Sequence, residues 1–483
     1  MVKDVIAKPL SEMINLSFES GIYPQKMKKA KVIPIHKKGS RLSIDNYRPI
    51  SLLSNINKLF EKLMYKRVYR FLTLKESFFE MQFGFREKHS TSHALISLTE
   101  KIREAIDTNN FACGIFIDLK KAFDTVDHEI LLKKLDYYGI RGLPNEWFRS
   151  YLTGREQFVS INGCDSKILK TNIGVPQGSV LGPLLFLIYI NDLNHAIKNS
   201  SVHHFADDTN LLHVNKSIKM LNRLLNQDLK SLCNWLKANK IALNATKTEM
   251  LFFRNQTKPF SNELCLRIDG KRIFPSHVVK YLGVYLDEFL SFKFHTNELS
   301  AKLRKSNGML AKLRHYVPLE TIRTIYFGIF ESHLIYCCTV WGQRGNRSSD
   351  KIISLQNTAL RIMTFSNYRA SSKPLYNQLK ILQFRQHVEL QNILLVNASL
   401  NKMNPVSFSN IFVLQGEAHN HATRNPLYLV RKNVRTTKYG IYSIKYQCTL
   451  AWNKVIAFGL LSDNWPLTNT SLSRMYKSHC FEL

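Results

Sequence analysis

The sequence lacks the patterns that identify several large classes of protein. Its eight cysteines are scattered, none form a C-x-x-C pair and no histidine spacing completes a zinc site, so we expect reduced thiols in an intracellular protein. No positively charged and then apolar leader opens the chain, which argues against secretion. The longest apolar run, residues 180–190, is too short to cross a bilayer and predicts no membrane span. Repeats and low-complexity tracts are also missing.

Acidic residues are scarce relative to basic ones. Lys and Arg number 68 against 36 Asp and Glu, a formal net charge of +32. This excess favours a polyanionic partner, nucleic acid first and an anionic membrane second. Because mitochondrial and ribosomal proteins are also basic, charge alone selects no function. The length of 483 residues predicts at least two domains, and 45% hydrophobic residues are typical of a globular chain.

The periodic segments predict an α+β arrangement that ends in helices. Helices are expected over residues 1–24, 55–73, 90–106, 180–193 and 216–240, and the pattern after residue 290 is wholly helical as far as about 345. A further helix is expected to begin soon after residue 118 and to run through 135. Strands are predicted over 31–35, 111–118, 157–161, 167–173, 202–214 (a hairpin), 264–268 and 279–286.

Three acids stand out against this background. Asp207 and Asp208 lie between apolar runs, which predicts a hairpin with both acids at its tip, although such a pair is by itself more often a solvated turn. Asp118 ends an apolar run typical of a strand buried on both faces, where a charge is costly without a partner. A helix-capping role for Asp118 is the alternative. If the two strands are neighbours in one sheet, the carboxylates converge, and Mg²⁺ is the cation that suits them.

Converging carboxylates of this kind suit nucleotidyl transfer. Two Mg²⁺ ions roughly 3.5–4 Å apart, or Mn²⁺ in their place, would activate a 3′-hydroxyl and stabilise a leaving pyrophosphate. The basic segment 25–41, followed by Arg48, suits the gripping of phosphates, with a solvated surface loop as the alternative. The Gly-Pro-rich loop 174–179 suits close approach to a flat ligand or a phosphate. The basic helical segment 299–319 suggests a nucleic-acid clamp or a plain helical bundle.

Six blocks, in order, resemble the reverse transcriptases of non-LTR retrotransposons of the LINE and jockey type. They are NYRPISL (46–52), QFGFR (82–86), FIDLKKAFD (116–124), GVPQGS (174–179), FADD (205–208) and YLG (281–283). The resemblance implies a right-hand polymerase in which fingers and palm carry an antiparallel sheet and helices. The implied division is a helical extension (1–24), fingers and palm (25–287), a helical thumb (288–345) and a C-terminal region of unknown role (346–483).

The resemblance also implies functions for individual residues. Asp118, Asp207 and Asp208 would be the catalytic metal ligands, with Asp208 contributing charge if it does not ligate directly. Phe123 would lie under the sugar and exclude a ribose 2′-hydroxyl. Asp124, Asp127 and His128 also match a family block, but for them we expect packing or capping. The other implied contacts are Lys37 or Lys38 with Arg48 on the triphosphate, Gln177 and Gly178 around the nucleotide, and Tyr281, Leu282 and Gly283 at the primer end.

The function implied is RNA-directed DNA synthesis. The partners would be an RNA template, a DNA primer or target DNA, and dNTPs, in a nuclear or cytoplasmic ribonucleoprotein. Relatives commonly carry an upstream endonuclease and a Cys/His knuckle. The segment before residue 25 is too short to hold an endonuclease, and no Cys/His knuckle pattern is found, so cleavage of the target in cis is not expected. A non-catalytic nucleic-acid-binding remnant of a truncated mobile element is therefore the alternative. An intron maturase or a viral RNA polymerase is a lesser rival, against which Phe123 counts.

Overall fold

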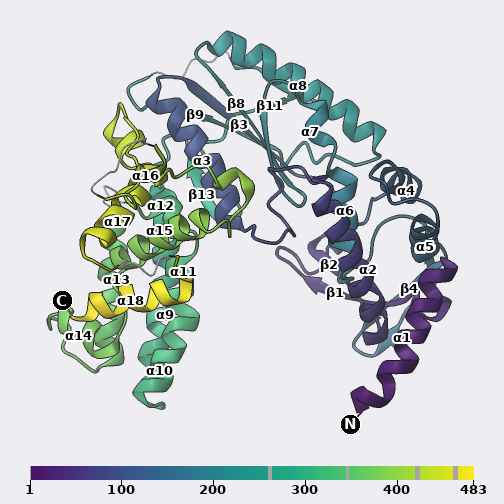
Figure 1. Cartoon of the computed structure of the whole chain (residues 1–483), viewed down its shortest axis with the longest axis horizontal. Helices are drawn as coiled ribbons and strands as arrows, with labels where there is room; N and C mark the ends of the chain where they lie inside the picture. The colour runs from purple at the N-terminus through teal and green to yellow at the C-terminus, as the bar shows by residue number, and fades with distance from the viewer. Residues whose placement is uncertain (1, 259–263, 344–347, 419–424, 461–465, 483) are drawn as a thin grey trace.

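The computed structural model describes residues 2–258, 264–343, 348–418, 425–460 and 466–482. The chain forms an arch, with a sheet near its top and two limbs that descend on either side (Figure 1). The N-terminal helix lies at the foot of one limb and the C-terminus on the other. The mixed helix and sheet content confirms the predicted α+β class.

The central sheet has four strands in the order β7-β8-β3-β9, and every neighbouring pair is antiparallel. The strands are β7 (Ser201–Phe205), β8 (Asp208–Asn215), β3 (Phe111–Ile117) and β9 (Glu249–Phe253). The predicted hairpin over 202–214 is therefore confirmed, and its second strand pairs with the predicted strand that ends before Asp118. This pairing brings the ends of the two strands to one edge of the sheet.

Both faces of this sheet are buried, which explains why β3 is apolar at nearly every position. Cys113, Ile115 and Ile117 belong to one apolar cluster, together with helices α6 and α8. Ala112 and Phe116 belong to a second cluster, together with helix α3 and the helices of the C-terminal limb. The covering helices are α3 (Thr91–Asp107), α6 (Leu181–Ile190), the short α7 (Leu193–Ala196) and α8 (Ile218–Ala238).

The N-terminal limb is built around a second sheet, in which β1 pairs antiparallel with β2 and parallel with β4. Its strands are β1 (Lys29–His36), β2 (Tyr47–Leu52), β4 (Arg155–Ile161), β5 (Cys164–Asp165) and β6 (Leu169–Thr171). Its helices are α1 (Val2–Ser20), α2 (Asn55–Leu74), α4 (His128–Tyr137) and α5 (Leu143–Leu152). The hairpin of β1 and β2 points toward the space beneath the central sheet (Figure 1).

The C-terminal limb shares one continuous apolar cluster with α3 and a face of the central sheet. Acids on α3 also anchor it: Glu100 accepts from the Ile444 nitrogen at 2.8 Å, and Asp107 accepts from the Thr436 nitrogen at 2.7 Å. Its main helices are α9 (Lys293–Leu313), α10 (Leu319–Tyr326), α13 (Ser348–Met363), α15 (Phe384–Leu400), α17 (Ile444–Ala457) and α18 (Asn469–Glu482). Shorter ones are α11 (Ser332–Ile335), α12 (Cys338–Trp341), α14 (Lys373–Leu379) and α16 (Gln415–Ala418).

Two expectations about secondary structure were wrong. Helix α4 begins only at His128, because Asp127 caps it through the Ile130 nitrogen at 3.0 Å and the preceding residues form turns. The single strand expected over 279–286 is a hairpin, since Leu282 and Gly283 both take positive φ (45° and 82°) between its strands. The hairpin strands are β12 (Val278–Tyr281) and β13 (Val284–Asp287), and a second small hairpin pairs β10 (Leu266–Ile268) with β11 (Lys271–Ile273).

Within the described ranges, no helix is both long and apolar enough to cross a membrane. The domain boundaries expected from the sequence remain predictions.

Buried histidines predict a loss of stability in mild acid. Burial lowers the pKa of both His203 and His204 to about 3, from an ordinary value near 6.5. Below pH 6.5 the unfolded chain binds protons that these folded imidazoles refuse, so the free energy of unfolding should fall by about 1.4 kcal/mol per pH unit for each. Urea titrations at pH 7 and pH 5 measure this slope. His203→Gln should reduce this slope by the contribution of one histidine, whereas His195→Gln, at an exposed position, should leave it unchanged. Equal slopes for His203→Gln and the wild type would contradict the claim that buried His203 stays unprotonated in the folded state.

Candidate active site

The structure brings the three predicted acids to one edge of the central sheet. Phe205 pairs with Asp208, so Ala206 and Asp207 form a two-residue turn at the tip of the hairpin. The last pair between β3 and β8 joins Ile117 to Thr209, so Asp118 leaves its strand beside Asp208. The two strands are thus neighbours in one sheet, and the three carboxylates lie at the same edge, as the sequence predicted.

The turn is held from below by the QFGFR segment, for which the sequence predicted only a turn. Ala206 has a φ of 56°, an uncommon conformation for a residue with a side chain. The Gln82 carboxamide oxygen stabilises it by accepting from the nitrogens of Ala206 (3.0 Å) and Gly84 (2.9 Å). A Cβ on Gly84 would lie 2.9 Å from the carbonyl carbon of Phe205 and closer still to the Ala206 nitrogen. Only glycine fits beneath the acids.

Asp118 is held from the side by the loop that precedes β9. The Asn244 amide donates to the Asp118 carboxylate at 2.7 Å, and the Asn244 backbone nitrogen donates to the Asp118 carbonyl at 2.9 Å. The Thr246 hydroxyl donates to the Asn244 side-chain oxygen at 2.9 Å, which fixes the amide with its nitrogen toward the acid. Sequence reasoning missed Asn244, because nothing local links it to an acid 126 positions away.

The electrostatics show that the acids act on one another. Removal of water by the surrounding protein, then the charges of Asp207 and Asp118, raise the pKa of Asp208 to about 6. The pKa of Asp207 is also raised, first by burial and then by Asp118. Opposing this, Lys37 lowers the pKa of both turn acids and Arg48 lowers that of Asp207. The cluster is thus strained by like charges and partly relieved by cations from the β1–β2 hairpin.

The same electrostatics distinguish the two candidate lysines. Lys37 and Arg48 are exposed near the facing ends of β1 and β2, with Ile35 paired to Arg48. Lys37 acts on both acids of the turn, whereas Lys38 is not among the charges that shift them. Of the two lysines that the sequence left open, Lys37 is therefore the one that the fold directs toward the acids.

Gln177 and Gly178 contact β2 of the N-terminal limb, and Phe123 packs on α6. The Phe123 ring stacks on Phe186 with centroids 4.7 Å apart, which fixes its orientation. Gln177 donates to the Asp124 carboxylate at 2.8 Å, and its backbone oxygen accepts from the Ser51 nitrogen at 2.7 Å. Gly178 has a φ of 109°, which strongly favours glycine. Gln177 is thus tied both to Asp124, the neighbour of Phe123, and to Ser51 of β2.

In the Tyr281-Leu282-Gly283 block, Tyr281 ends β12, and Leu282 and Gly283 form the β12–β13 turn. The Tyr281 side chain is buried against Phe116, with ring centroids 5.3 Å apart, so its ring cannot face a primer. Leu282 and Gly283 form the accessible part of the block, and the Tyr336 hydroxyl fixes the turn by donating to the Leu282 oxygen at 2.8 Å.

Asp124, Asp127 and His128 have the packing and capping contacts expected of them. Asp127 caps α4 and pairs with Lys240 at 2.7 Å. The His128 ring bonds the Gly174 oxygen at 2.8 Å, which ties α4 to the Gly-Pro-rich loop. These contacts hold α4 and the Gly-Pro-rich loop in place.

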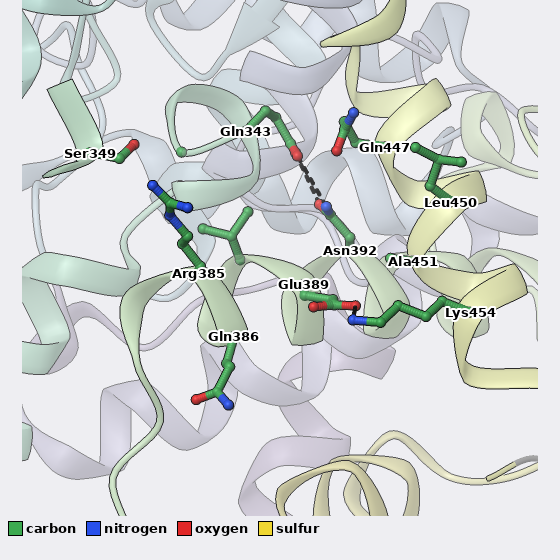
Figure 2. Close-up of a pocket in the computed structure, with 12 residues that line it drawn as sticks. Gln343, Ser349, Arg385, Gln386, Glu389, Asn392, Gln447, Leu450, Ala451 and Lys454 are labelled. Atoms are coloured by element: carbon green, nitrogen blue, oxygen red, sulfur yellow. Dashed lines mark hydrogen bonds and ion pairs between the residues drawn. The ribbon is translucent and has the colours of Figure 1, made fainter. Parts of the chain in front are cut away.

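Two cavities lie away from the acids. One, of about 380 Å³, is lined by the C-terminal limb, where Gln343 and Asn392 bond each other and Lys454 pairs with Glu389 (Figure 2). The other, of about 350 Å³, lies between α3 and residues 432–446. Their polar side chains are largely paired within the protein, so neither matches the chemistry of the carboxylate cluster.

Comparison with known proteins decides the family. The model of the reverse transcriptase (RNA-dependent DNA polymerase) family matches residues 35–286, which contain all three acids and the supports described above. The chain belongs to the reverse transcriptase family. This membership accords with the right-hand polymerase architecture expected from the sequence.

Relatives of this reverse transcriptase chain come from mobile elements. It is 29% identical over 407 residues to the RNA-directed DNA polymerase from mobile element jockey of Drosophila melanogaster. This match covers 81% of this chain and 43% of that protein. It is 30% identical over 393 residues to the probable RNA-directed DNA polymerase from transposon BS of the same species, covering 77% and 42%. The chain thus spans less than half the length of these relatives.

Solved structures of telomerase show a weaker likeness. The telomerase of Candida albicans with a fragment of telomeric RNA matches with a TM-score of 0.37 and 13% identity, over 74% of this chain and 62% of that one. Apo telomerase of Candida tropicalis matches with a TM-score of 0.38 and 13% identity, over 83% and 72%.

Reverse transcriptases generally use divalent metal ions, and the donor set of this site fits such ions. Three carboxylates supply only oxygen ligands, as Mg²⁺ prefers. Burial and then the neighbouring carboxylates raise the pKa values of Asp207 and Asp208, and a bound cation would offset the repulsion among these carboxylates. Across the described residues, however, no three His, Cys, Asp or Glu side chains already stand in a metal-binding group, and the Asp118 carboxylate is bonded to Asn244.

Gly84→Ala should displace the acidic turn without unfolding the chain. The added methyl group would collide with the backbone of Phe205 and Ala206, and a shift of about 1 Å at a catalytic site can reduce activity about 100-fold. RNA-templated primer extension and the melting temperature measure the two effects. Gly328→Ala is the control, since a Cβ there meets open space. Full activity in Gly84→Ala would show that the turn does not depend on this contact.

Proposed function

We propose that this chain is the RNA-directed DNA polymerase of a non-LTR retrotransposon, extending a DNA 3′-hydroxyl with dNTPs on an RNA template. One observation carries the proposal: Asp118, Asp207 and Asp208 converge at a sheet edge that faces the basic β1–β2 hairpin, in a chain of the reverse transcriptase family. The relatives named as RNA-directed DNA polymerases of mobile elements support the choice of template and product.

The three acids are the proposed catalytic residues and would hold two Mg²⁺ ions, or Mn²⁺ in their place. Such ions would lower the pKa of an attacking 3′-hydroxyl and stabilise the leaving pyrophosphate. Asp118 and Asp207 are the principal ligands in this proposal, with Asp208 adding at least its charge. Asn244 and Gln82 hold the acids in position, so little reorganisation is needed during the reaction.

The nucleotide would lie between the acids and the N-terminal limb. Lys37 and Arg48 would bind its triphosphate as exposed cations opposite the acids. Phe123, fixed by Phe186, would lie under the sugar and exclude a 2′-hydroxyl. Gln177 and Gly178 would border the base and sugar as the unit tied to Asp124 and Ser51.

The remaining parts follow the division expected from the sequence. Residues 25–287 would be fingers and palm, residues 288–345 the thumb, and the Leu282-Gly283 turn the contact with the primer end. The C-terminal region, residues 346–483, contributes described helices to the same apolar cluster as the thumb. It would therefore stabilise the position of the thumb against α3.

Primer extension on an RNA template tests the activity. Asp207→Ala removes a carboxylate from the cluster and should reduce incorporation by at least about 10³-fold, because several kcal/mol of charge stabilisation are lost. Asp165→Ala, an exposed acid on β5, is the matched control and should extend as the wild type does. Absence of extension by the wild type with Mg²⁺ or Mn²⁺, together with salt-dependent RNA binding, would favour the non-catalytic remnant instead.

Phe123→Val tests the sugar contact. A smaller side chain should leave room for a 2′-hydroxyl, so ribonucleotide incorporation should rise by about tenfold or more, since discrimination of small groups in apolar sites is worth about 10–200-fold. Extension with dNTPs by the same variant serves as its internal control and should persist. Unchanged selectivity would remove Phe123 from this role.

A further inference from the structure

The far end of the C-terminal limb is formed by two helices that end together. Asn307 on α9 donates to the Leu355 oxygen of α13 at 3.0 Å, and Arg314 donates to the Ile362 oxygen at 3.2 Å. Because both contacts join positions 48 apart, the helices run in the same direction and their C-terminal ends meet. The 21 residues of α9 span about 30 Å, so this end lies far from the central sheet (Figure 1).

Three aromatic side chains are exposed on the loops at this end. Tyr316 is 84% exposed, Tyr368 is 79% exposed and Phe365 is 57% exposed. Single exposed hydrophobic residues are common, but several aromatic rings on adjoining loops mark an interaction site. The two loops are joined, because Arg314 lies over the Phe365 ring at 4.5 Å and His315 contacts it at 5.3 Å.

Phe365 occupies a position that normally belongs to glycine. It follows α13 with a φ of 53°, and the Ser366 nitrogen bonds back to the Arg361 oxygen at 3.0 Å, the pattern of a helix end that usually carries glycine. A bulky residue in this conformation is strained. The Phe365 ring is more than half exposed, so burial of the ring does not offset the cost of this strained backbone conformation. The Arg361 side chain fixes the rest of the loop by bonding the Ala370 oxygen at 2.8 Å.

The surroundings of these rings are strongly basic. Neither segment 299–319 nor segment 351–388 contains an acidic residue. Arg314 binds the Ile362 oxygen in the last turn of α13, as cations commonly do at helix ends, and Arg361 binds the Ala370 oxygen in the loop that follows. The exposed cations of the loops and their flanks are Lys312, Arg369 and Lys373. We call these three residues, with Tyr316, Phe365 and Tyr368, the tip surface.

Exposed rings among cations suit unpaired nucleotides. A duplex keeps the faces of its bases stacked inside, whereas a single strand offers them to aromatic side chains while its phosphates contact cations. We propose that the tip surface binds an unpaired stretch of the RNA template outside the polymerase site. The choice of RNA rests on the proposed function and on Tyr316 and Tyr368, whose exposed phenols can bond a 2′-hydroxyl.

Binding of matched substrates tests this proposal. The full chain is titrated against an RNA–DNA duplex with blunt ends, and against the same duplex with the RNA strand extended at its 5′ or its 3′ end, using fluorescence anisotropy. The wild type should bind at least one extended duplex more tightly. Tyr316→Ala with Tyr368→Ala should weaken that binding about tenfold or more and leave blunt-duplex affinity unchanged. Tyr137→Ala, also a 75% exposed tyrosine, is the matched control.

Two further variants separate this surface from folding and from catalysis. Phe365→Gly removes the ring and relieves the φ strain, so it should weaken binding of the extended duplex without lowering the melting temperature. Asp207→Ala should lose extension but keep the preference for the overhang, so failure of the polymerase proposal and failure of this one are distinguishable. The proposal is overturned if the wild type shows no preference, or if the double variant retains it. An equal preference for a DNA overhang overturns the assignment to RNA.

Discussion

Mutual repulsion among three carboxylates is the interaction on which the rest of this structure depends. Asp118, Asp207 and Asp208 meet at one sheet edge, where lost hydration and then the neighbouring carboxylates raise the pKa of both turn acids. Such a cluster disperses unless its backbone is fixed. The close approach of Gly84 and the bond from Asn244 to Asp118 supply that rigidity. The free energy stored in the repulsion is then available to bind cations and the phosphates that accompany them.

The helices and sheets of the rest of the chain fix the position of this sheet edge. The central sheet is buried on both faces, so its strands cannot shift relative to one another without disrupting two apolar clusters. One face carries α6 and α8, and the other carries α3 and described helices of the C-terminal limb. Glu100 and Asp107 on α3 bind backbone nitrogens of that limb, which links it to the sheet independently of the α9 connection. Both limbs therefore have fixed positions on either side of the acids.

The sequence was sufficient to predict the acids and their hairpin, because an apolar run that ends in Asp118 and an Asp-Asp step between apolar runs are local patterns. It could not predict Asn244 or Gln82 as supports, since their contacts join distant segments. Helix α15 lacked a clear periodicity because buried polar residues interrupt its apolar pattern, among them Asn392 and Asn397. The β12–β13 turn was missed because Leu282 takes a positive φ, which its residue type does not announce.

The most direct test of this account measures stability and activity on one variant, Asp207→Asn. The amide keeps the size of the side chain but removes the charge of a carboxylate whose pKa is raised by burial and by Asp118. At pH 8 the repulsion of Asp207 with Asp118 and Asp208 is therefore lost, and only that between Asp118 and Asp208 remains. In metal-free urea titrations, the account predicts a higher free energy of unfolding for Asp207→Asn than for the wild type, together with loss of RNA-templated DNA synthesis. A variant that is less stable, or one that still extends primers, would contradict the claim that the charge is retained for catalysis at the expense of stability.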